Sequence, residues 1–375
     1  MSWKLPLFKI YTDEADLQAV TEVLRRGTYW AEGPEIVEFE RGLKDYQEKK
    51  YAVAFNSGTS ALHAALLAYG IKGGDEVIVP SFTFIATANA PLFVKAKPIF
   101  ADIEEQTLGL DPEDVEAKIT PKTKAVIPVH YAGCPCKIRE LREIADDHHL
   151  LLIEDAAESF GASIGDKKAG SYGEGGVLSF CQNKVVPTGE GGALVTDSRE
   201  IYEKAKLIRS HGRQENSAYF SSIENLDYIT LGYNFRMPSM IAALGIAQLK
   251  KIDMLISTRR QNAEYLTARL EKEVREITPP APPEGYRHVY QMYTVMAEKR
   301  DGLMRHLADS GIMTKIYFNP VHLTRFYRDI LKYTPYLPIT EKVADLALTL
   351  PVYPGLTKEE MDLLVNEIKT FYELN

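Results

Sequence analysis

Short apolar runs alternate with segments of helical periodicity along most of the chain. Residues 13–26 place apolar side chains on one side of a helix, and Gly27 follows as a stop signal. Further helices are predicted over residues 34–48, 60–69, 138–147, 199–210, 238–256, 303–310 and 359–372. Short strands are predicted over residues 51–55, 76–80, 98–102, 125–130, 150–153, 176–181, 193–196, 288–297 and 312–318.

Strands that read as continuous apolar runs and alternate with helices are typical of a mostly parallel sheet covered by helices on both faces. The sequence therefore predicts an α/β protein. We place a change of domain near residue 250. The expected division is a large domain over residues 12–250 and a smaller α/β C-terminal domain over residues 251–375, with residues 1–11 packed on the smaller one.

Charge and hydropathy restrict the partners. The 375 residues include 44 Lys and Arg and 52 Asp and Glu, which gives a formal net charge of −8. Non-specific nucleic-acid binding needs a basic patch, and no basic run occurs, so we expect no nucleic-acid partner. The most apolar long stretch, residues 77–94, is broken by Pro80 and Pro91, so we expect buried structure there and no membrane helix.

The cysteines indicate a reducing compartment. Cys134, Cys136 and Cys181 are too few and too clustered for a disulfide framework. No second Cys pair or His cluster completes a four-ligand site with Cys134 and Cys136, so we expect no metal site. The first residues lack the apolar core of a signal peptide. We therefore expect a cytoplasmic protein.

The first candidate for ligand binding is the helix start after residues 51–55. Asn56-Ser57-Gly58-Thr59-Ser60 brings backbone N–H groups, hydroxyls and a glycine together, which suits a phosphate. An ordinary N-cap explains the same residues. The loop has neither the glycine fingerprint of dinucleotide-binding proteins nor a P-loop lysine, which disfavours nicotinamide-dependent oxidoreductases and nucleoside triphosphate enzymes.

Two further candidates lie at strand ends. Asp155 stands at the carboxyl end of an apolar strand, where ligands bind in open α/β sheets. It could hold a proton on a cofactor nitrogen, coordinate a metal or cap the following segment. Lys184 follows another strand and precedes the glycine-rich residues 188–192, which let backbone approach closely. It could form a Schiff base, although most lysines are solvated surface charges.

Taken together, a phosphate-binding helix start, an acidic strand end and a lysine are the parts that pyridoxal 5′-phosphate (PLP) requires. Specific motifs add to this combination: Arg26-Gly27, Gly33-Pro34-Glu35, Ser57-Gly58-Thr59, Pro80-Ser81-Phe82-Thr83-Phe84, Glu154-Asp155-Ala156-Ala157-Glu158, Ser179-Phe180, Asn183-Lys184, Thr188-Gly189-Glu190-Gly191-Gly192, Gly232-Tyr233-Asn234-Phe235-Arg236-Met237, Leu350-Pro351 and Tyr353-Pro354-Gly355-Leu356-Thr357. Through them nearly the whole chain resembles the DegT/DnrJ/EryC1/StrS family, fold-type-I PLP-dependent aminotransferases that act on nucleotide-linked keto-sugars.

The resemblance implies roles for the cofactor residues. Lys184 would bind the cofactor aldehyde covalently, and Asp155 would keep the pyridine nitrogen protonated. Phe84 would stack on the ring. The residues implied to hold the phosphate are Gly58, Thr59 and Ser179.

Two positions carry further implications of the resemblance. Asn234 corresponds to a residue that usually reaches the cofactor phosphate of the neighbouring subunit, which implies a homodimer with composite active sites. Glu158 is a departure, because this position is often Gln in relatives. An ionised Glu beside the cofactor phenolate would repel it unless the carboxylate is protonated or paired.

Candidate substrate residues are His322, Arg236 and Tyr317. The expected ligands are anionic while the protein has a net negative charge, so local positive sites are needed. We expect them at Lys184, Arg236, His322 and the helix start at Thr59.

The activity that the resemblance implies is transamination from glutamate to a nucleotide-diphosphate-linked sugar. Asn-Lys followed by Thr-Gly-Glu-Gly-Gly is similar to the branch that aminates 4-keto-6-deoxy sugars, which favours a 4-amino product. A 3-keto sugar or cyclitol aminotransferase is the alternative within the fold, whereas a dehydratase would carry His in place of Lys184. A PLP-binding sensory protein is the non-enzymatic alternative, and the complete set of Lys184, Asp155 and Ser179 disfavours it.

Overall fold

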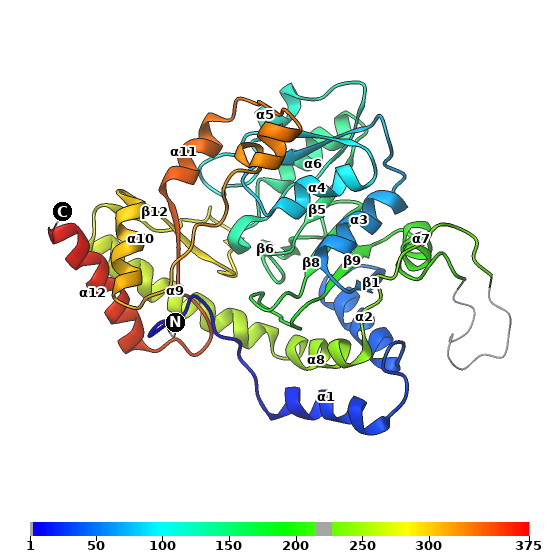
Figure 1. Cartoon of the computed structure of the whole chain (residues 1–375), viewed down its shortest axis with the longest axis horizontal. Helices are drawn as coiled ribbons and strands as arrows, with labels where there is room; N and C mark the ends of the chain where they lie inside the picture. Colours follow the sequence, from blue (N-terminus) through cyan, green and yellow to red (C-terminus); the bar gives the residue numbers. More distant parts are fainter. Residues whose placement is uncertain (1–2, 215–226, 375) are drawn as a thin grey trace.

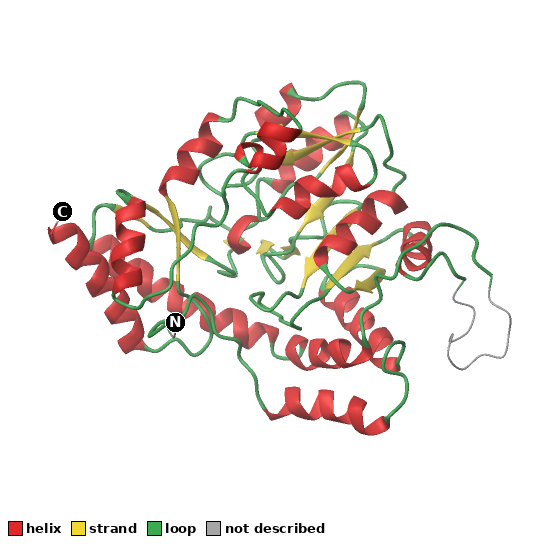
Figure 2. Cartoon of the chain, in the orientation of Figure 1, coloured by secondary structure: helices red, strands yellow, loops and turns green. Residues whose placement is uncertain are grey.

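A seven-stranded sheet runs through the larger part of the molecule, with helices on both of its faces (Figures 1 and 2). The computed structural model describes residues 3–214 and 227–374. Across the sheet the strands are β1 (Tyr51–Phe55), β9 (Gly192–Thr196), β8 (Gly175–Ser179), β5 (Leu151–Asp155), β4 (Thr123–Val126), β2 (Glu76–Pro80) and β3 (Lys97–Ala101). The pairs from β8 to β3 are parallel, and β9 is antiparallel to both of its neighbours. The predicted α/β fold with a mostly parallel sheet is confirmed.

Burial on both faces explains the apolar runs of the strands. Val53 and Phe55 of β1 join the core beneath α3, α4 and α7, whereas Ala52 and Ala54 point to the opposite core beneath α2. The helices of this part are α1 (Glu14–Arg26), α2 (Pro34–Tyr46), α3 (Gly58–Ala68), α4 (Ile85–Phe93), α5 (Pro112–Ala117), α6 (Ile138–Asp147), α7 (Arg199–Arg209) and α8 (Ser239–Leu249).

The C-terminal part has a core of its own. Its sheet has the order β10 (Ile277–Thr278), β12 (Tyr293–Ala297) and β13 (Ala347–Leu350), and its helices are α9 (Ile252–Glu273), α10 (Arg300–Asp309) and α12 (Lys358–Leu374). Leu5 lies in this core and forms a parallel bridge with Ile312, and both chain ends lie in this part of the molecule (Figure 1). Helix α9 joins the two parts, because Ile256 packs in one core and Leu266 in the other. The division near residue 250 stays a prediction.

A small sheet also connects the two parts. In it β11 (Tyr286–Arg287) pairs with β6 (Ser163–Ile164), which pairs with β7 (Lys167–Lys168). Strands of two residues carry no periodic pattern, so the sequence did not indicate them.

Other predicted elements differ from the structure. The strand expected over residues 312–318 is wrong, because the segment changes partners and forms only single bridges, from Ile312 to Leu5 and from Lys315 to Thr349. The helix expected over residues 238–256 is divided between α8 and α9. Further elements that were not predicted are the helices α4, α5 and α11 (Pro338–Leu346) and the strands β10 and β13. The 3-10 turns at Tyr131–Gly133 and Val321–Leu323 and the π-helical turn at Phe326–Ile330 were also not predicted.

Neither a membrane-spanning helix nor a cluster of metal ligands occurs in the part of the chain that the structure describes. Within residues 3–214 and 227–374, no helix combines the length and apolar character needed to cross a bilayer. The same ranges contain no group of three or more His, Cys, Asp or Glu side chains arranged to hold one metal ion.

A buried carboxylate fixes the loop beside the end of β5. Glu154 is fully buried, and its two oxygens accept hydrogen bonds from the backbone N–H groups of Gly170, Tyr172 and Gly173 at 2.6–2.7 Å. His130 Nε2 also lies 2.9 Å from Glu154 Oε2, while His130 Nδ1 accepts from a backbone N–H. His130 is therefore a donor to the carboxylate, which receives four hydrogen bonds.

Replacing Glu154 should destabilise the protein strongly. Glu154→Ala leaves the buried N–H groups of Gly170 and Gly173 and the part-buried N–H of Tyr172 without an acceptor. We therefore expect a loss of at least about 3 kcal/mol in the free energy of unfolding, measured by urea denaturation. Glu48→Ala is the control, because Glu48 is exposed and forms only a surface ion pair with Lys168, and it should change stability by less than about 1 kcal/mol. Equal losses in the two variants would contradict the structural role of Glu154.

Candidate active site

The predicted cofactor residues gather at one edge of the central sheet. Phe55, Gly192 and Ser179 lie side by side in register on β1, β9 and β8, and Asp155 of β5 lies opposite Val177 of β8. Because this edge holds the carboxyl ends of the parallel strands, it is where ligands bind in sheets of this kind.

The start of α3 forms an anion cradle. Ser57 caps the helix, and its Oγ accepts from the Ser60 N–H at 3.1 Å. The N–H groups of Gly58 and Thr59 stand in the first turn, where helix geometry provides no intrahelical acceptor. A Cβ at Gly58 would lie 3.1 Å from Ser179 Cβ, so the serine is packed directly against the helix start.

Gly192 closes the other side of this cradle. A Cβ at Gly192 would lie 2.4 Å from the backbone N of Gly58 and 2.4 Å from the carbonyl O of Ser57, so any side chain there would displace the helix start. Within the glycine-rich residues 188–192, Gly192 is thus required by close packing against the cradle.

Asp155 is a buried carboxylate with two hydrogen-bond donors. Thr87 Oγ1 donates to Oδ2 at 2.8 Å, and the Ala157 N–H donates to Oδ1 at 3.2 Å. Burial raises the pKa of Asp155 above its ordinary value; the two hydrogen bonds and the charge of Lys184 oppose this rise, while the charge of Glu158 adds to it.

Lys184 forms an ion pair with Glu158, the residue at which the sequence departs from the family pattern. Lys184 Nζ lies 3.4 Å from Glu158 Oε1, and Glu158 Oε2 accepts from the Ala132 N–H at 3.0 Å. The turn that carries Lys184 is held from the C-terminal part, since Gln291 Nε2 donates to the carbonyl of Asn183 at 2.5 Å. The structure therefore pairs the carboxylate of Glu158 with a cation.

Two predicted cofactor residues lie at the surface of the single chain. Phe84 precedes α4 and is 56% exposed. Asn234 is exposed, and its carbonyl O lies 3.5 Å from Asn56 Nδ2, next to the helix cradle. Both side chains are available to ligands or to a second chain.

The three candidate substrate residues lie in different surroundings. His322 is 2% exposed; its Nδ1 lies 2.7 Å from Ser81 Oγ and its Nε2 3.4 Å from Glu341 Oε1. Burial lowers the pKa of His322, although the neighbouring Glu341 opposes this fall. Burial removes the water that stabilises a charged imidazole, which counts against the positive site expected at His322, and the role of this residue stays a prediction.

Arg236 and Tyr317 are more accessible. Arg236 donates to Ser210 Oγ at 3.2 Å and lies 3.6 Å from a carboxylate oxygen of Glu32. Tyr317 is half-buried and forms a side-chain hydrogen bond with Asn183, the residue before Lys184. Their roles as substrate ligands stay predictions.

Sequence reasoning missed the side chains that orient this site. Thr87 and Thr83 are buried and join Asp155 through hydrogen bonds, and the N–H of Ala132 holds Glu158. Thr87 could have been found only from a prediction of α4, because its position in the first turn brings it beside the strand end.

The site fits PLP by the chemistry of its donors. The first turn of α3 offers N–H groups to a phosphate, Asp155 keeps lone pairs beyond its two hydrogen bonds, and Phe84 presents an aromatic face. The Lys184 amine lies 3.4 Å from Glu158, which follows Asp155 by three residues. Each function that the cofactor needs is present in the described residues.

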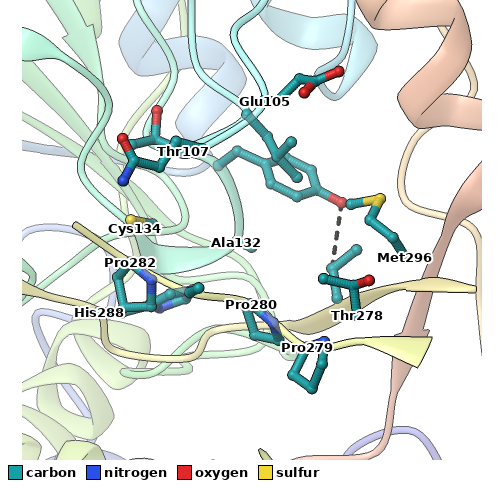
Figure 3. Close-up of a pocket in the computed structure, with 15 residues that line it drawn as sticks. Glu105, Thr107, Ala132, Cys134, Thr278, Pro279, Pro280, Pro282, His288 and Met296 are labelled. Carbon is teal, nitrogen blue, oxygen red and sulfur yellow. Dashed lines mark hydrogen bonds between the residues drawn. The ribbon is translucent and has the colours of Figure 1, made fainter. Parts of the chain in front are cut away.

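A separate cavity of about 270 Å³ is lined in part by Ala132, whose N–H donates to Glu158. Glu105 and Thr107 lie on one side of it and Pro279 and Pro280 on the other (Figure 3). Among the described residues that line it, none is a predicted cofactor residue. The cavity is therefore a neighbour of the candidate active site and no part of it.

Comparison with known proteins identifies the family. The model of the DegT/DnrJ/EryC1/StrS aminotransferase family matches residues 11–369. The GDP-perosamine synthase of Caulobacter vibrioides is 39% identical over 335 residues, which cover 88% of each chain. The solved structure of DesV from S. venezuelae has a TM-score of 0.90 at 32% identity and covers 100% of this chain and 99% of that one.

A second solved structure bears on the cofactor. The PLP form of the sugar aminotransferase Spr1654 from Streptococcus pneumoniae, described as putative in its name, has a TM-score of 0.91 at 26% identity, covering 100% of this chain and 98% of that one. With the family match over nearly the whole chain and a site whose donors fit PLP, the protein belongs to the DegT/DnrJ/EryC1/StrS family and is a PLP-dependent aminotransferase.

Proposed function

We propose that this enzyme transfers the amino group of glutamate to the C4 ketone of a 6-deoxy sugar linked to a nucleoside diphosphate. The observation that carries the transamination is the lysine at the sheet edge, with Nζ 3.4 Å from Glu158 and Asp155 close by. The sugar is supported by the Caulobacter relative, which is named for a GDP-linked product, and by the form of the loop after Lys184.

The reaction is balanced without an external oxidant or reductant. Glutamate loses its amino group and two electrons at the α-carbon and becomes 2-oxoglutarate. The ketone carbon of the sugar gains the amino group and the same two electrons. One water is consumed when the oxo acid is released, and one is formed when the sugar ketone loses its oxygen.

Each step has a residue positioned for it. PLP, when bound, supplies an aldehyde that accepts amines and a ring that accepts electrons. The backbone N–H groups of Gly58 and Thr59, with the Ser179 hydroxyl, hold the phosphate, and Phe84 provides the stacking face. Asp155 holds the proton on the pyridine nitrogen.

The amine of Lys184 moves protons at the reacting carbons. As a free amine, Lys184 Nζ would take the proton from the α-carbon of glutamate and would return a proton to the sugar carbon in the second half of the reaction. Glu158 lies within 3.4 Å of Nζ and receives the Ala132 N–H, so it holds the amine at the sheet edge.

We also propose that the enzyme acts as a homodimer in which each active site includes Asn234 of the second chain. The apolar side of α1 supports an interface, because Leu17 is 63% exposed and Leu24 45% exposed, although a helix face of this kind is usually buried. The exposed Trp30 and Asn234 extend the accessible region.

A cytoplasmic location completes the proposal. The three cysteines are free thiols, and Cys134 and Cys136 are buried in the reduced form. This is the state that a reducing compartment maintains.

A turnover screen tests the substrate. Glutamate is incubated with PLP-loaded enzyme and nucleoside-diphosphate-linked 4-keto-6-deoxy or 3-keto sugars, and products are identified by mass spectrometry and NMR. We expect amination of the 4-keto sugars only, and none with Lys184→Ala, which lacks the proton-transfer amine. Amination at C3 alone would overturn the regiochemistry, and no amination of any sugar would overturn the substrate class.

Mixed dimers test the composite site. Lys184→Ala and Asn234→Ala are each expected to be nearly inactive, but their co-expression should restore about one quarter of wild-type activity, because half of the dimers are mixed and each has one intact site. Lys184→Ala with Asp155→Asn is the control, since those two residues belong to the same chain's site and no mixture restores them. Absence of recovery in the first pair would contradict shared sites.

A further inference from the structure

A chain of buried hydroxyls leads from the segment that carries Phe84 to Asp155. Thr87 Oγ1 lies 2.8 Å from Asp155 Oδ2, and Thr83 Oγ1 lies 2.9 Å from Thr87 Oγ1. Thr83 is 2% exposed and Thr87 1% exposed. Water therefore does not replace these contacts, and each hydroxyl depends on the next for its partner.

In its ionised form, Asp155 fixes the direction of this series of hydroxyl hydrogen bonds. A carboxylate only accepts hydrogen bonds, so the single proton of the Thr87 hydroxyl points to Asp155 Oδ2. Thr87 Oγ1 can then act only as acceptor toward Thr83, whose own proton completes the chain. Aligned hydroxyls polarise one another, which strengthens the bond to the carboxylate.

The hydrogen-bonded hydroxyls of Thr83 and Thr87 connect two sides of the cofactor site. Phe84 is the residue after Thr83, and its carbonyl O accepts from the Thr87 N–H at 3.2 Å in the first turn of α4. The placement of the aromatic residue and the orientation of the Asp155 carboxylate are thus coupled through one helix turn.

We propose that Thr87 is a positioning residue for Asp155, and that its hydroxyl holds the carboxylate ionised and aimed at the ring nitrogen of PLP, with Thr83 orienting Thr87. The inference rests on the proposed role of Asp155 toward that nitrogen. It assigns a function to α4, an element outside the strand ends where the cofactor residues lie.

The charges around Asp155 explain why its ionised form depends on the Thr87 hydroxyl. Burial and the neighbouring Glu158 disfavour the ionised form, whereas Lys184 and the hydrogen bonds from Thr87 and the Ala157 N–H favour it.

Removal of the hydroxyl should weaken cofactor binding in a pH-dependent way. The probe is pyridoxamine 5′-phosphate, which has no aldehyde and binds without a bond to Lys184, and affinity is measured by titration calorimetry on cofactor-free protein. Thr87→Val keeps the side-chain shape and should reduce affinity roughly tenfold at neutral pH. The loss should grow as pH falls, because removing a donor raises the pKa of the Asp155 carboxyl.

Three comparisons separate positioning from packing. Thr87→Ser keeps the hydroxyl and should bind within about threefold of wild type, and Thr83→Val should have an effect smaller than that of Thr87→Val. An analogue of the probe with carbon in place of the ring nitrogen should bind wild type and Thr87→Val equally, since it offers no proton to Asp155.

The proposal is overturned if Thr87→Val binds the probe as wild type does, if its loss is the same at every pH, or if the carbon analogue shows the same loss. It is also overturned if Thr87→Ser loses affinity as much as Thr87→Val. The binding experiment contains no sugar, so failure of the turnover screen would leave its result intact and would concern only the proposed substrate.

Discussion

Burying a carboxylate costs free energy unless hydrogen-bond donors or cations replace the water that it loses, and Asp155 at the end of β5 meets this condition. Thr87 and the Ala157 N–H supply donors, and Lys184 supplies positive charge. Because these groups come from α4, from the loop after β5 and from the turn after β8, the carboxylate can be held only when the sheet and its connections are assembled. The candidate active site is in this sense a product of the whole large sheet.

Glu154, the residue before Asp155, is a second buried carboxylate that needs hydrogen-bond donors, and it lies on the other face of the strand. Successive residues of a strand point to opposite faces, so Glu154 points away from Asp155. Glu154 receives three backbone N–H groups and His130 Nε2, and it fixes residues 170–173. One strand end therefore holds two buried carboxylates with different tasks: one is satisfied by the protein alone, and the other keeps lone pairs for a ligand.

The parts of the fold that could be predicted are those in which local pattern and burial agree. The central strands are buried on both faces and appear as apolar runs, and Asp155 and Lys184 were found because they stand at the ends of such runs. The role of Ser179 was implied only by the family resemblance. Helix α4 was missed because it is short, mostly apolar and contains Pro91, and its few polar residues do not mark a polar side. Thr87 could not be assigned without that helix. The surroundings of His322 depend on Ser81 and Glu341, which are distant in sequence, and no local pattern indicates them.

The net charge of −8 raises the question of how the protein attracts anionic ligands. The side-chain cations expected to do so are already engaged: Lys184 lies 3.4 Å from a carboxylate oxygen of Glu158, and Arg236 lies 3.6 Å from Glu32. Burial lowers the pKa of His322, which disfavours a positive charge on its ring. The first turn of α3 differs from these side chains. Its N–H groups carry only partial positive charge, so they do not need a neighbouring carboxylate to balance them. A phosphate can therefore bind there without breaking an ion pair, whereas a ligand that recruits Arg236 must compete with Glu32. This difference favours α3 as the anchor of the cofactor and makes the Arg236–Glu32 pair an exchangeable contact, suited to a substrate that must also leave.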